Sequence, residues 1–327
     1  MNKLPYEKEF GILVKEEAEG EFGKRPEERT VEELLDFGIL NLNKQQGPTS
    51  HQVSDYVKKI LKVKRAGHSG TLDPNVTGVL PIALNRGTRI LKFLLKSGKE
   101  YICLMHLHKE VPESKIKKIM RKFVGKIKQK PPVRSAVKRV EREREVYYLE
   151  ILEIDGKDVL FRIGCEAGTY IRRVCDDIGK ALETGAHMQQ LIRTKVSLFN
   201  DSNWASMHDL KDAFEFYNEG NEDEIKKIIL PVENAVKYLP KVWIFDSCID
   251  SLCHGADLNI PGISRLNEGI EKDDLVAVMT LKDELVCIGN AEMSSGDVMK
   301  KKKGKVIGAK KVFMTIKDQP EPSTDSL

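Results

Sequence analysis

A glycine-rich loop that leads directly into an apolar segment constrains the fold of this chain more than any other stretch. Residues 67–80 read GHSGTLDPNVTGVL, and the apolar run continues to residue 84. A short apolar run bounded by turn residues is typical of a buried strand. The loop holds one carboxylate, Asp73, directly before Pro74. Two interpretations of Asp73 are open at this point: an Asx-type turn, in which the side chain bonds the backbone, or a carboxylate held in place for chemistry.

Periodicity predicts strands and helices on both sides of this loop. Residues 100–108 have the length of a strand and little polar alternation, so they predict a central strand covered on both faces. Residues 144–154 and 159–165 flank Asp-Gly-Lys and predict a hairpin. Two further strands are expected over 37–42 and 189–199. Four helices are expected: one capped by Thr49 or Ser50, and three over residues 88–96, 114–124 and 170–182.

The helix predicted over 170–182 begins with two cations. Its apolar positions Ile171, Val174 and Ile178 predict the buried face, while Arg172 and Arg173 lie in the first turn. Cations are unfavourable at a helix N-terminus because of the helix dipole. A residue placed against its local preference invites a functional explanation, and here we expect an acid opposite the arginine.

The chain is long enough for more than one domain. At 327 residues it can bury two cores. Residues 1–35 are dominated by Glu, Lys and Arg and predict an extension that packs late or on another element. Residues 36–235 predict the main domain, with its end near the acidic stretch 218–224 and the region 231–240. Residues 240–316 contain several short strands typical of a small β-barrel, and residues 317–327 predict a polar tail.

Composition narrows the function classes. Between Lys115 and Arg144 there are 13 Lys or Arg against two acids, which marks a solvated face or a site for a polyanion. The six cysteines have no zinc-ribbon spacing, and neither the cluster around Cys248 nor the pair His106 and His108 predicts a metal site. No apolar run has membrane-spanning length. We therefore expect a reduced cytoplasmic or nuclear protein with no metal and no membrane association.

Four segments and the C-terminal region resemble a known family. The segments are LNKQQGPTSHQV (42–53), GHSGTLDPNVTGVLPIAL (67–84), KEYICLMHLH (99–108) and AGTYIRRVCDDIG (167–179). They resemble the TruB family of RNA pseudouridine synthases, and within it the dyskerin-type enzymes. The region that begins with ADLNIPGI (256–263) resembles a PUA domain. The first segment departs from the usual Lys-Pro-x-Gly form, since it reads Lys44-Gln45-Gln46-Gly47.

This resemblance implies an α+β fold and an isomerase. The fold would be a mixed, largely antiparallel sheet flanked by helices, with the small PUA barrel after it. The reaction would convert uridine to pseudouridine in RNA without a cofactor. By similarity Asp73 is the catalytic carboxylate, Arg172 its ion-pair partner, and Tyr101 stacks on the target base and handles the C5 proton. RNA-binding roles are implied for His68, where the target nucleotide leaves the stack, and also for Lys44, Tyr170 and Arg193.

The resemblance also implies partners. The segment 130–139 (KPPVRSAVKR) and the full-size PUA-like unit are similar to archaeal dyskerin-type proteins, which favours the cytoplasm. Such proteins work with a box H/ACA guide RNA, two small accessory proteins and a kink-turn-binding protein on ribosomal RNA. Two alternatives stay open: a stand-alone enzyme that modifies the TΨC arm of tRNA, and a non-catalytic RNA-binding scaffold in which Asp73 is only a turn residue.

Overall fold

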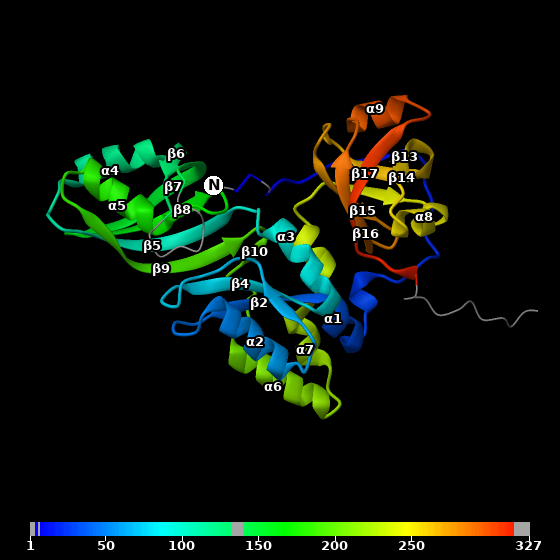
Figure 1. The fold of residues 1–327 in the computed structure, drawn as a ribbon, viewed down its shortest axis with the longest axis horizontal. Helices are drawn as coiled ribbons and strands as arrows, with labels where there is room; N and C mark the ends of the chain where they lie inside the picture. Colours follow the sequence, from blue (N-terminus) through cyan, green and yellow to red (C-terminus); the bar gives the residue numbers. More distant parts are fainter. Residues whose placement is uncertain (1–3, 6, 132–139, 317–327) are drawn as a thin grey trace, which may run out of the picture. The chain divides into compact units, whose positions relative to one another are not determined.

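The computed structural model of the protein describes residues 4–5, 7–131 and 140–316 (Figure 1). The predicted tail and most of the segment 130–139 lie outside the described residues. The chain groups into two compact units: Met1–Glu7 with Glu33–Leu230, and Lys8–Glu32 with Pro231–Leu327. Among the described residues, no helix has the length and apolar character needed to cross a bilayer.

A ten-stranded mixed sheet organises the first unit. Its main path follows the order β11-β2-β4-β9-β5-β8-β7-β6, with β3 paired to β4 and β10 to β9. The predicted central strand, β5, lies between β9 and β8 and pairs antiparallel with both, whereas β4 and β9 pair in parallel. The α+β prediction is thereby confirmed. The strands are β2 (Gly38–Lys44), β3 (Ala66–His68), β4 (Thr77–Leu84), β5 (Lys99–Leu107), β6 (Gly125–Gln129), β7 (Arg142–Asp155), β8 (Asp158–Cys165), β9 (Ala186–Val196), β10 (Phe199–Asn200) and β11 (Ile229–Pro231).

Helices α4 (Glu113–Met120) and α5 (Ile171–Ala181) cover β5, β7 and β8 (Figure 1). The predicted apolar face of α5 is buried in the same cluster as Cys103 and Phe161 of the sheet. Helix α2 (Ser50–Ile60) begins at Thr49, whose hydroxyl accepts a hydrogen bond from the Gln52 amide. This cap satisfies an amide that would otherwise lack a partner at the helix start. The other helices of this unit are α1 (Val31–Phe37), α3 (Leu91–Leu94), α6 (Met207–Asn218) and α7 (Asp223–Ile228).

One predicted helix differs from the structure. The helix expected over 88–96 is a 3-10 segment, Asn85–Ile90, followed by the single turn α3. Ile90, Leu91, Phe93 and Leu94 are all buried, so burial on several sides replaces the one-sided apolar stripe of a surface helix.

The division between the two units falls at Pro231, at the start of the region 231–240. The acidic stretch 218–224 precedes it and connects α6 to α7.

The second unit has a sheet of seven short strands around its own core. The strand order is β1-β14-β12-β15-β16-β17-β13. Its first strand comes from the N-terminal extension and pairs antiparallel with β14. The elements are β1 (Ile12–Val14), β12 (Lys241–Ile244), α8 (Ile249–Cys253), β13 (Leu258–Asn259), β14 (Ile263–Asn267), β15 (Leu275–Met279), β16 (Leu285–Ala291), α9 (Ser295–Lys300) and β17 (Lys305–Val312).

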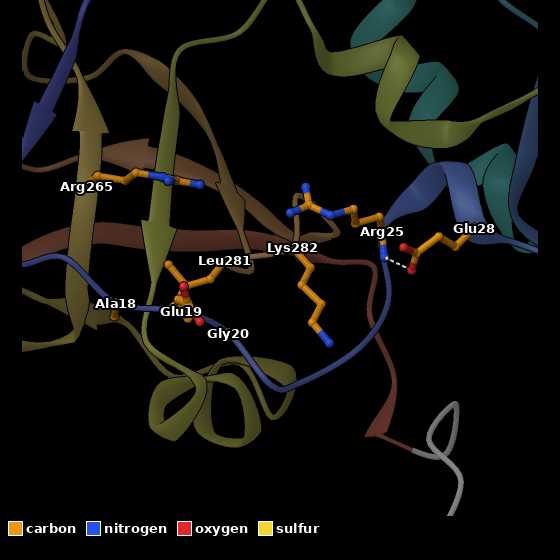
Figure 2. A pocket seen from close by; sticks show the side chains of 8 residues that line it. All are labelled: Ala18, Glu19, Gly20, Arg25, Glu28, Arg265, Leu281 and Lys282. Atoms are coloured by element: carbon orange, nitrogen blue, oxygen red, sulfur yellow. Dashed lines mark hydrogen bonds between the residues drawn. The ribbon is translucent and has the colours of Figure 1, made fainter.

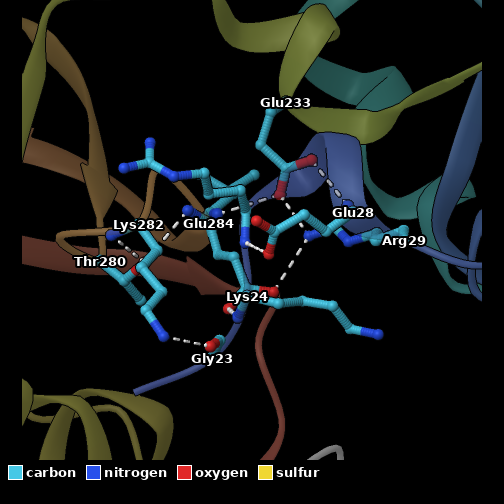
Figure 3. Close-up of polar contacts among 10 residues, drawn as sticks. Gly23, Lys24, Glu28, Arg29, Glu233, Thr280, Lys282 and Glu284 are labelled. Carbon is cyan, nitrogen blue, oxygen red and sulfur yellow. Dashed lines mark hydrogen bonds and ion pairs between the residues drawn. The ribbon is translucent and has the colours of Figure 1, made fainter. Parts of the chain in front are cut away.

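An ion-pair network fastens the rest of the extension to the same unit (Figure 3). Arg29 donates two hydrogen bonds to the Glu233 carboxylate, each 2.8 Å, and a longer one to Glu284 at 3.4 Å. Lys282 Nζ donates to the carbonyl of Gly23. Arg29 and Glu233 are 7% and 6% exposed, and removing one partner of a buried pair costs roughly 3–5 kcal/mol. Residues 8–32 therefore form an integral part of this unit.

Candidate active site

The Asp73 loop is held by hydrogen bonds from helix α2 and from its own backbone. Ser50 Oγ accepts a hydrogen bond from the Leu72 amide at 2.8 Å and lies 3.2 Å from the Leu72 carbonyl. The Val76 amide donates to the Asp73 carbonyl at 3.0 Å. In the described part of the chain, the Asp73 carboxylate accepts a hydrogen bond from Arg172 and none from its own loop. This geometry is not that of an Asx turn, and the catalytic role of Asp73 stays a prediction.

Asp73 and Arg172 form a close ion pair although 99 residues separate them. Arg172 Nη2 lies 2.6 Å from Asp73 Oδ2, and the side chains are 55% and 56% exposed. The acid expected opposite the first turn of α5 is thus present. An exposed ion pair contributes little to stability, at most about 1 kcal/mol. Its value to the protein therefore lies in how it holds the carboxylate and not in the energy of folding.

Tyr101 and Arg193 are neighbours on β5 and β9. Arg193 is 1% exposed; its Nε donates to the Val79 carbonyl at 2.8 Å and its Nη2 to the Gly70 carbonyl at 3.2 Å. Its charge acts on the Tyr101 phenol. Burial raises the pKa of the Tyr101 phenol, and Arg193 opposes part of that rise. The phenol is therefore neutral at physiological pH, with a buried guanidinium as its neighbour.

Lys44 donates hydrogen bonds to the backbone of the Asp73 loop. It is 1% exposed, and its ammonium donates to the carbonyls of Gln45 at 3.0 Å, Pro74 at 3.1 Å and Val76 at 2.8 Å. Burial lowers the pKa of Lys44, with Asp73 opposing the shift. The RNA contact predicted for Lys44 stays a prediction. What the geometry supports is a role in fixing the carbonyls of Pro74 and Val76, which follow Asp73 in the loop.

Gly78 lets two strands approach closely behind the loop. It pairs with Arg193 where β4 and β9 run in parallel, and its φ is +111°. A Cβ atom at this position would lie 2.2 Å from the Arg193 carbonyl oxygen. Any other residue would therefore push away the strand that carries Arg193, in addition to the strain of a positive φ.

His68 is neutral and has a hydrogen atom without an acceptor. Its Nδ1 accepts a hydrogen bond from the Gly70 amide at 3.3 Å, which places the ring proton on Nε2. That Nε2 is buried and lacks a partner among the described residues. The His51 ring lies edge-on with 4.8 Å between centroids. Burial lowers the pKa of His68 from 6.5 to about 4, and His51 and Arg193 add to the shift.

This pKa gives a testable pH dependence. A base whose pKa falls on folding takes up a proton first in the unfolded chain, so the His68 contribution lowers stability as pH falls from 6.5 towards about 4. An NMR titration of the His68 ring should have its midpoint near 4. His68→Gln should flatten the decline of unfolding free energy over this range, whereas His208→Gln, at an exposed histidine of α6, should not. A midpoint near 6.5 would contradict the buried neutral ring.

Tyr170 lies at the N-cap of α5, two residues before Arg172. Its backbone amide and carbonyl each form a hydrogen bond with the Gln129 side chain. The RNA-binding role predicted for its ring stays a prediction.

Two residues near the site were not predicted from the sequence. One is Gln129. The other is Glu100, a buried carboxylate that accepts hydrogen bonds from Tyr148 Oη at 2.5 Å and Thr194 Oγ1 at 2.7 Å. No local pattern signals either contact, because each joins residues far apart in the chain.

The second unit contains a recess of about 560 Å³ (Figure 2). Charged side chains of both signs line it, namely Glu19, Arg25, Glu28, Arg265 and Lys282. Glu28 Oε2 accepts a hydrogen bond from the Arg25 amide at 3.0 Å. None of the predicted site residues lines this recess, so the candidate active site is the group around Asp73 in the first unit.

Comparison with protein families assigns nearly the whole chain. Residues 58–171 match the TruB family pseudouridylate synthase N-terminal domain, and residues 172–237 match the tRNA pseudouridylate synthase B C-terminal domain. Residues 240–313 match the PUA domain, and residues 4–54 match the DKCLD domain.

Relatives and solved structures agree along the full length. The probable tRNA pseudouridine synthases B of Thermococcus onnurineus and Methanopyrus kandleri are 54% and 47% identical, over 95% of this chain and 95% and 93% of theirs. A chain of a Cbf5-Nop10-Gar1 complex has a TM-score of 0.90 and 51% identity, covering 96% of this chain and 97% of that one. A chain of an H/ACA RNP bound to a substrate RNA containing 2′-deoxyuridine has a TM-score of 0.89 and 49% identity, with the same coverage. The chain therefore belongs to the TruB family of pseudouridylate synthases, isomerases that act on RNA, and it carries a PUA domain after its catalytic part.

Proposed function

We propose that this protein converts selected uridines of ribosomal RNA to pseudouridine under the direction of a box H/ACA guide RNA. We propose in addition that the protein modifies the TΨC arm of tRNA without a guide RNA. The guide-directed activity is supported by the likeness, over 96% of the chain, to a protein solved in an H/ACA RNP with substrate RNA. The tRNA activity is supported by the names of the relatives, which are tRNA pseudouridine synthases B.

The proposed partners follow from the same likeness. Two small accessory proteins are supported by the complex that contains Nop10 and Gar1, and a kink-turn-binding protein completes the expected particle. The PUA domain would hold the guide through shape and backbone contacts, while base pairing supplies the sequence specificity. A cytoplasmic location and a part in ribosome biogenesis belong to this proposal.

The observation that carries the chemistry is the 2.6 Å contact between Asp73 Oδ2 and Arg172 Nη2. In the proposed reaction the bond between N1 of uracil and C1′ of ribose breaks, the base turns, and C5 joins C1′; C5 then loses its proton and N1 gains one. Asp73 either attacks C1′ as a nucleophile or removes the 2′ proton to give a glycal, and both routes need an ionised carboxylate. Arg172 would hold the carboxylate in place through that contact.

The remaining predicted residues have roles that fit their positions. Tyr101, neutral and next to Arg193, would stack on the base and relay the proton released from C5. His68 would occupy the space that the extruded nucleotide leaves, and its unpaired Nε2 hydrogen would find an acceptor on the RNA. Because the product is an isomer of the substrate, the reaction consumes no oxidant, reductant or co-substrate, and we propose that it uses no cofactor. Lys44 and Arg193 would act through the loop and through Tyr101.

The experiment is a modification map of RNA treated with purified protein. One arm uses tRNA transcripts with the protein alone; the other uses ribosomal RNA fragments with the accessory proteins and either a matched or a scrambled guide. Pseudouridine at the guide-paired position only with the matched guide is the expected result. Modification in the tRNA arm and none in the ribosomal RNA arm would contradict the guide-directed activity and support only the guide-free one. RNA binding without modification in both arms would favour the scaffold alternative.

A further inference from the structure

Helix α5 lacks the side-chain cap that commonly stabilises a helix N-terminus. The starts of α2 and α6 are capped by the hydroxyls of Thr49 and Ser206. The N-cap residue of α5 is Tyr170, which has no side-chain cap, and the first turn contains no acid. Arg172 and Arg173 make that turn still less favourable through the helix dipole. The helix that presents the catalytic arginine therefore depends on contacts from outside itself.

Gln129, the last residue of β6, supplies such a contact. Its Oε1 accepts a hydrogen bond from the Tyr170 amide at 3.0 Å, and its Nε2 donates to the Tyr170 carbonyl at 3.2 Å. The side chain belongs to a residue that is only 4% exposed. Because one end of the amide must accept and the other must donate, the pair of bonds fits a single orientation of the Gln129 amide. The Tyr170 peptide groups are thus fixed in both position and direction.

The fixed residue lies next to the catalytic pair. Arg172 follows Tyr170 by two residues, and its guanidinium reaches Asp73 while more than half exposed. An exposed arginine receives little restraint from packing, so the direction in which the backbone leaves Tyr170 decides where the guanidinium lies. A displacement of about 1 Å in a catalytic group can lower a rate by about 100-fold.

We propose that Gln129 is a positioning residue that sets Arg172 against Asp73 and couples the end of β6 to the catalytic pair. The proposal rests on the function proposed above. Gln129 does not touch the reacting atoms; it acts through the Tyr170 backbone.

Two substitutions test the proposal in the full particle. Gln129→Met keeps the approximate volume and removes both hydrogen bonds, and it should lower the single-turnover rate by about 10–100-fold with RNA affinity within about twofold. Gln129→Glu keeps the acceptor for the Tyr170 amide but directs a second carboxylate oxygen at the Tyr170 carbonyl. When protonated, the same side chain both accepts and donates, as the amide does. Its rate relative to the wild type should therefore recover as pH falls, whereas the relative rate of Gln129→Met should stay flat.

A matched control is Gln190→Glu, at an exposed glutamine of β9, which should follow the wild type at every pH. A merely structural role for Gln129 would lower thermal stability but would not produce the pH-dependent recovery. A rate for folded Gln129→Met within about twofold of the wild type, or a flat relative profile for Gln129→Glu, would overturn the proposal.

A crystal structure of Gln129→Met separates this proposal from the proposed function. The expected result is loss of the contact between Arg172 Nη2 and Asp73 Oδ2, which measures 2.6 Å in the wild type. An unchanged contact would overturn the positioning role whatever the enzyme does. If the wild type modifies no RNA in any arm, the proposed function fails, yet the displacement of Arg172 can still be observed.

Discussion

Asp73→Asn is expected to lower the single-turnover rate of pseudouridine formation by at least about 1,000-fold. The amide neither attacks C1′ nor removes the 2′ proton, so both candidate routes lose their reacting group. The side chain is 56% exposed and its recorded partner is Arg172. The substitution therefore removes the charge without opening a cavity in the core, and the fold should be retained.

The measurement is the rate under enzyme excess, together with the dissociation constant of the substrate RNA. Affinity should stay within about threefold of the wild type, with any change towards tighter binding, because a negative charge facing a polyanion is removed. The matched control is Asp201→Asn, at an exposed aspartate in the turn after β10, which should keep the wild-type rate. A rate for Asp73→Asn within about tenfold of the wild type would assign the chemistry to another residue.

One member of this pair breaks a local expectation that is visible without a structure: Arg172 stands where the helix dipole disfavours a cation. Asp73 taken alone is compatible with an ordinary turn. The resemblance then connected the two segments, and the 2.6 Å contact agrees with that connection. Strands β4, β5, β7 and β8 were also predicted, since their apolar patterns are long and bounded by clear turns.

Burial of the charged residues could not be predicted. In a sequence, Lys44 and Arg193 are cations beside a site for RNA, and an exposed contact with phosphate is the natural expectation. In the structure both are 1% exposed and donate to carbonyls from distant segments. That outcome depends on the close approach at Gly78 and on the loop carbonyls, which are tertiary features. The ion pair between Arg29 and Glu233 could not be predicted either, because it joins residues 204 positions apart in the chain.

The second large effect is expected for Arg193→Met. The substitution removes the donor to the carbonyls of Val79 and Gly70 and the positive charge beside Tyr101. Each buried acceptor left unpaired costs roughly 1–3 kcal/mol. Arg193 is itself a buried cation whose pKa burial lowers, so its removal recovers part of this loss. We expect the free energy of unfolding of the first unit to fall by roughly 2–4 kcal/mol.

The rate should fall as well, by about 10–100-fold, because both Tyr101 and the Gly70 end of the Asp73 loop lose their contact with the Arg193 guanidinium.

The stability and rate of Arg193→Lys should lie between those of the wild type and of Arg193→Met. An ammonium keeps the charge but lacks the planar guanidinium, which can donate to separate acceptors. The control is Arg142→Met on β7, at an exposed arginine, which should contribute less than about 1 kcal/mol. Chemical denaturation gives the stability, and single-turnover rates measured at a temperature where every variant is folded give the catalysis. Equal stability losses for the Arg193 and Arg142 variants would show that Arg193 does not hold the two carbonyls as its hydrogen bonds indicate. A loss of stability with an unchanged rate would show that Arg193 stabilises the fold but does not contribute to catalysis. Tyr101 would then keep its position without the guanidinium.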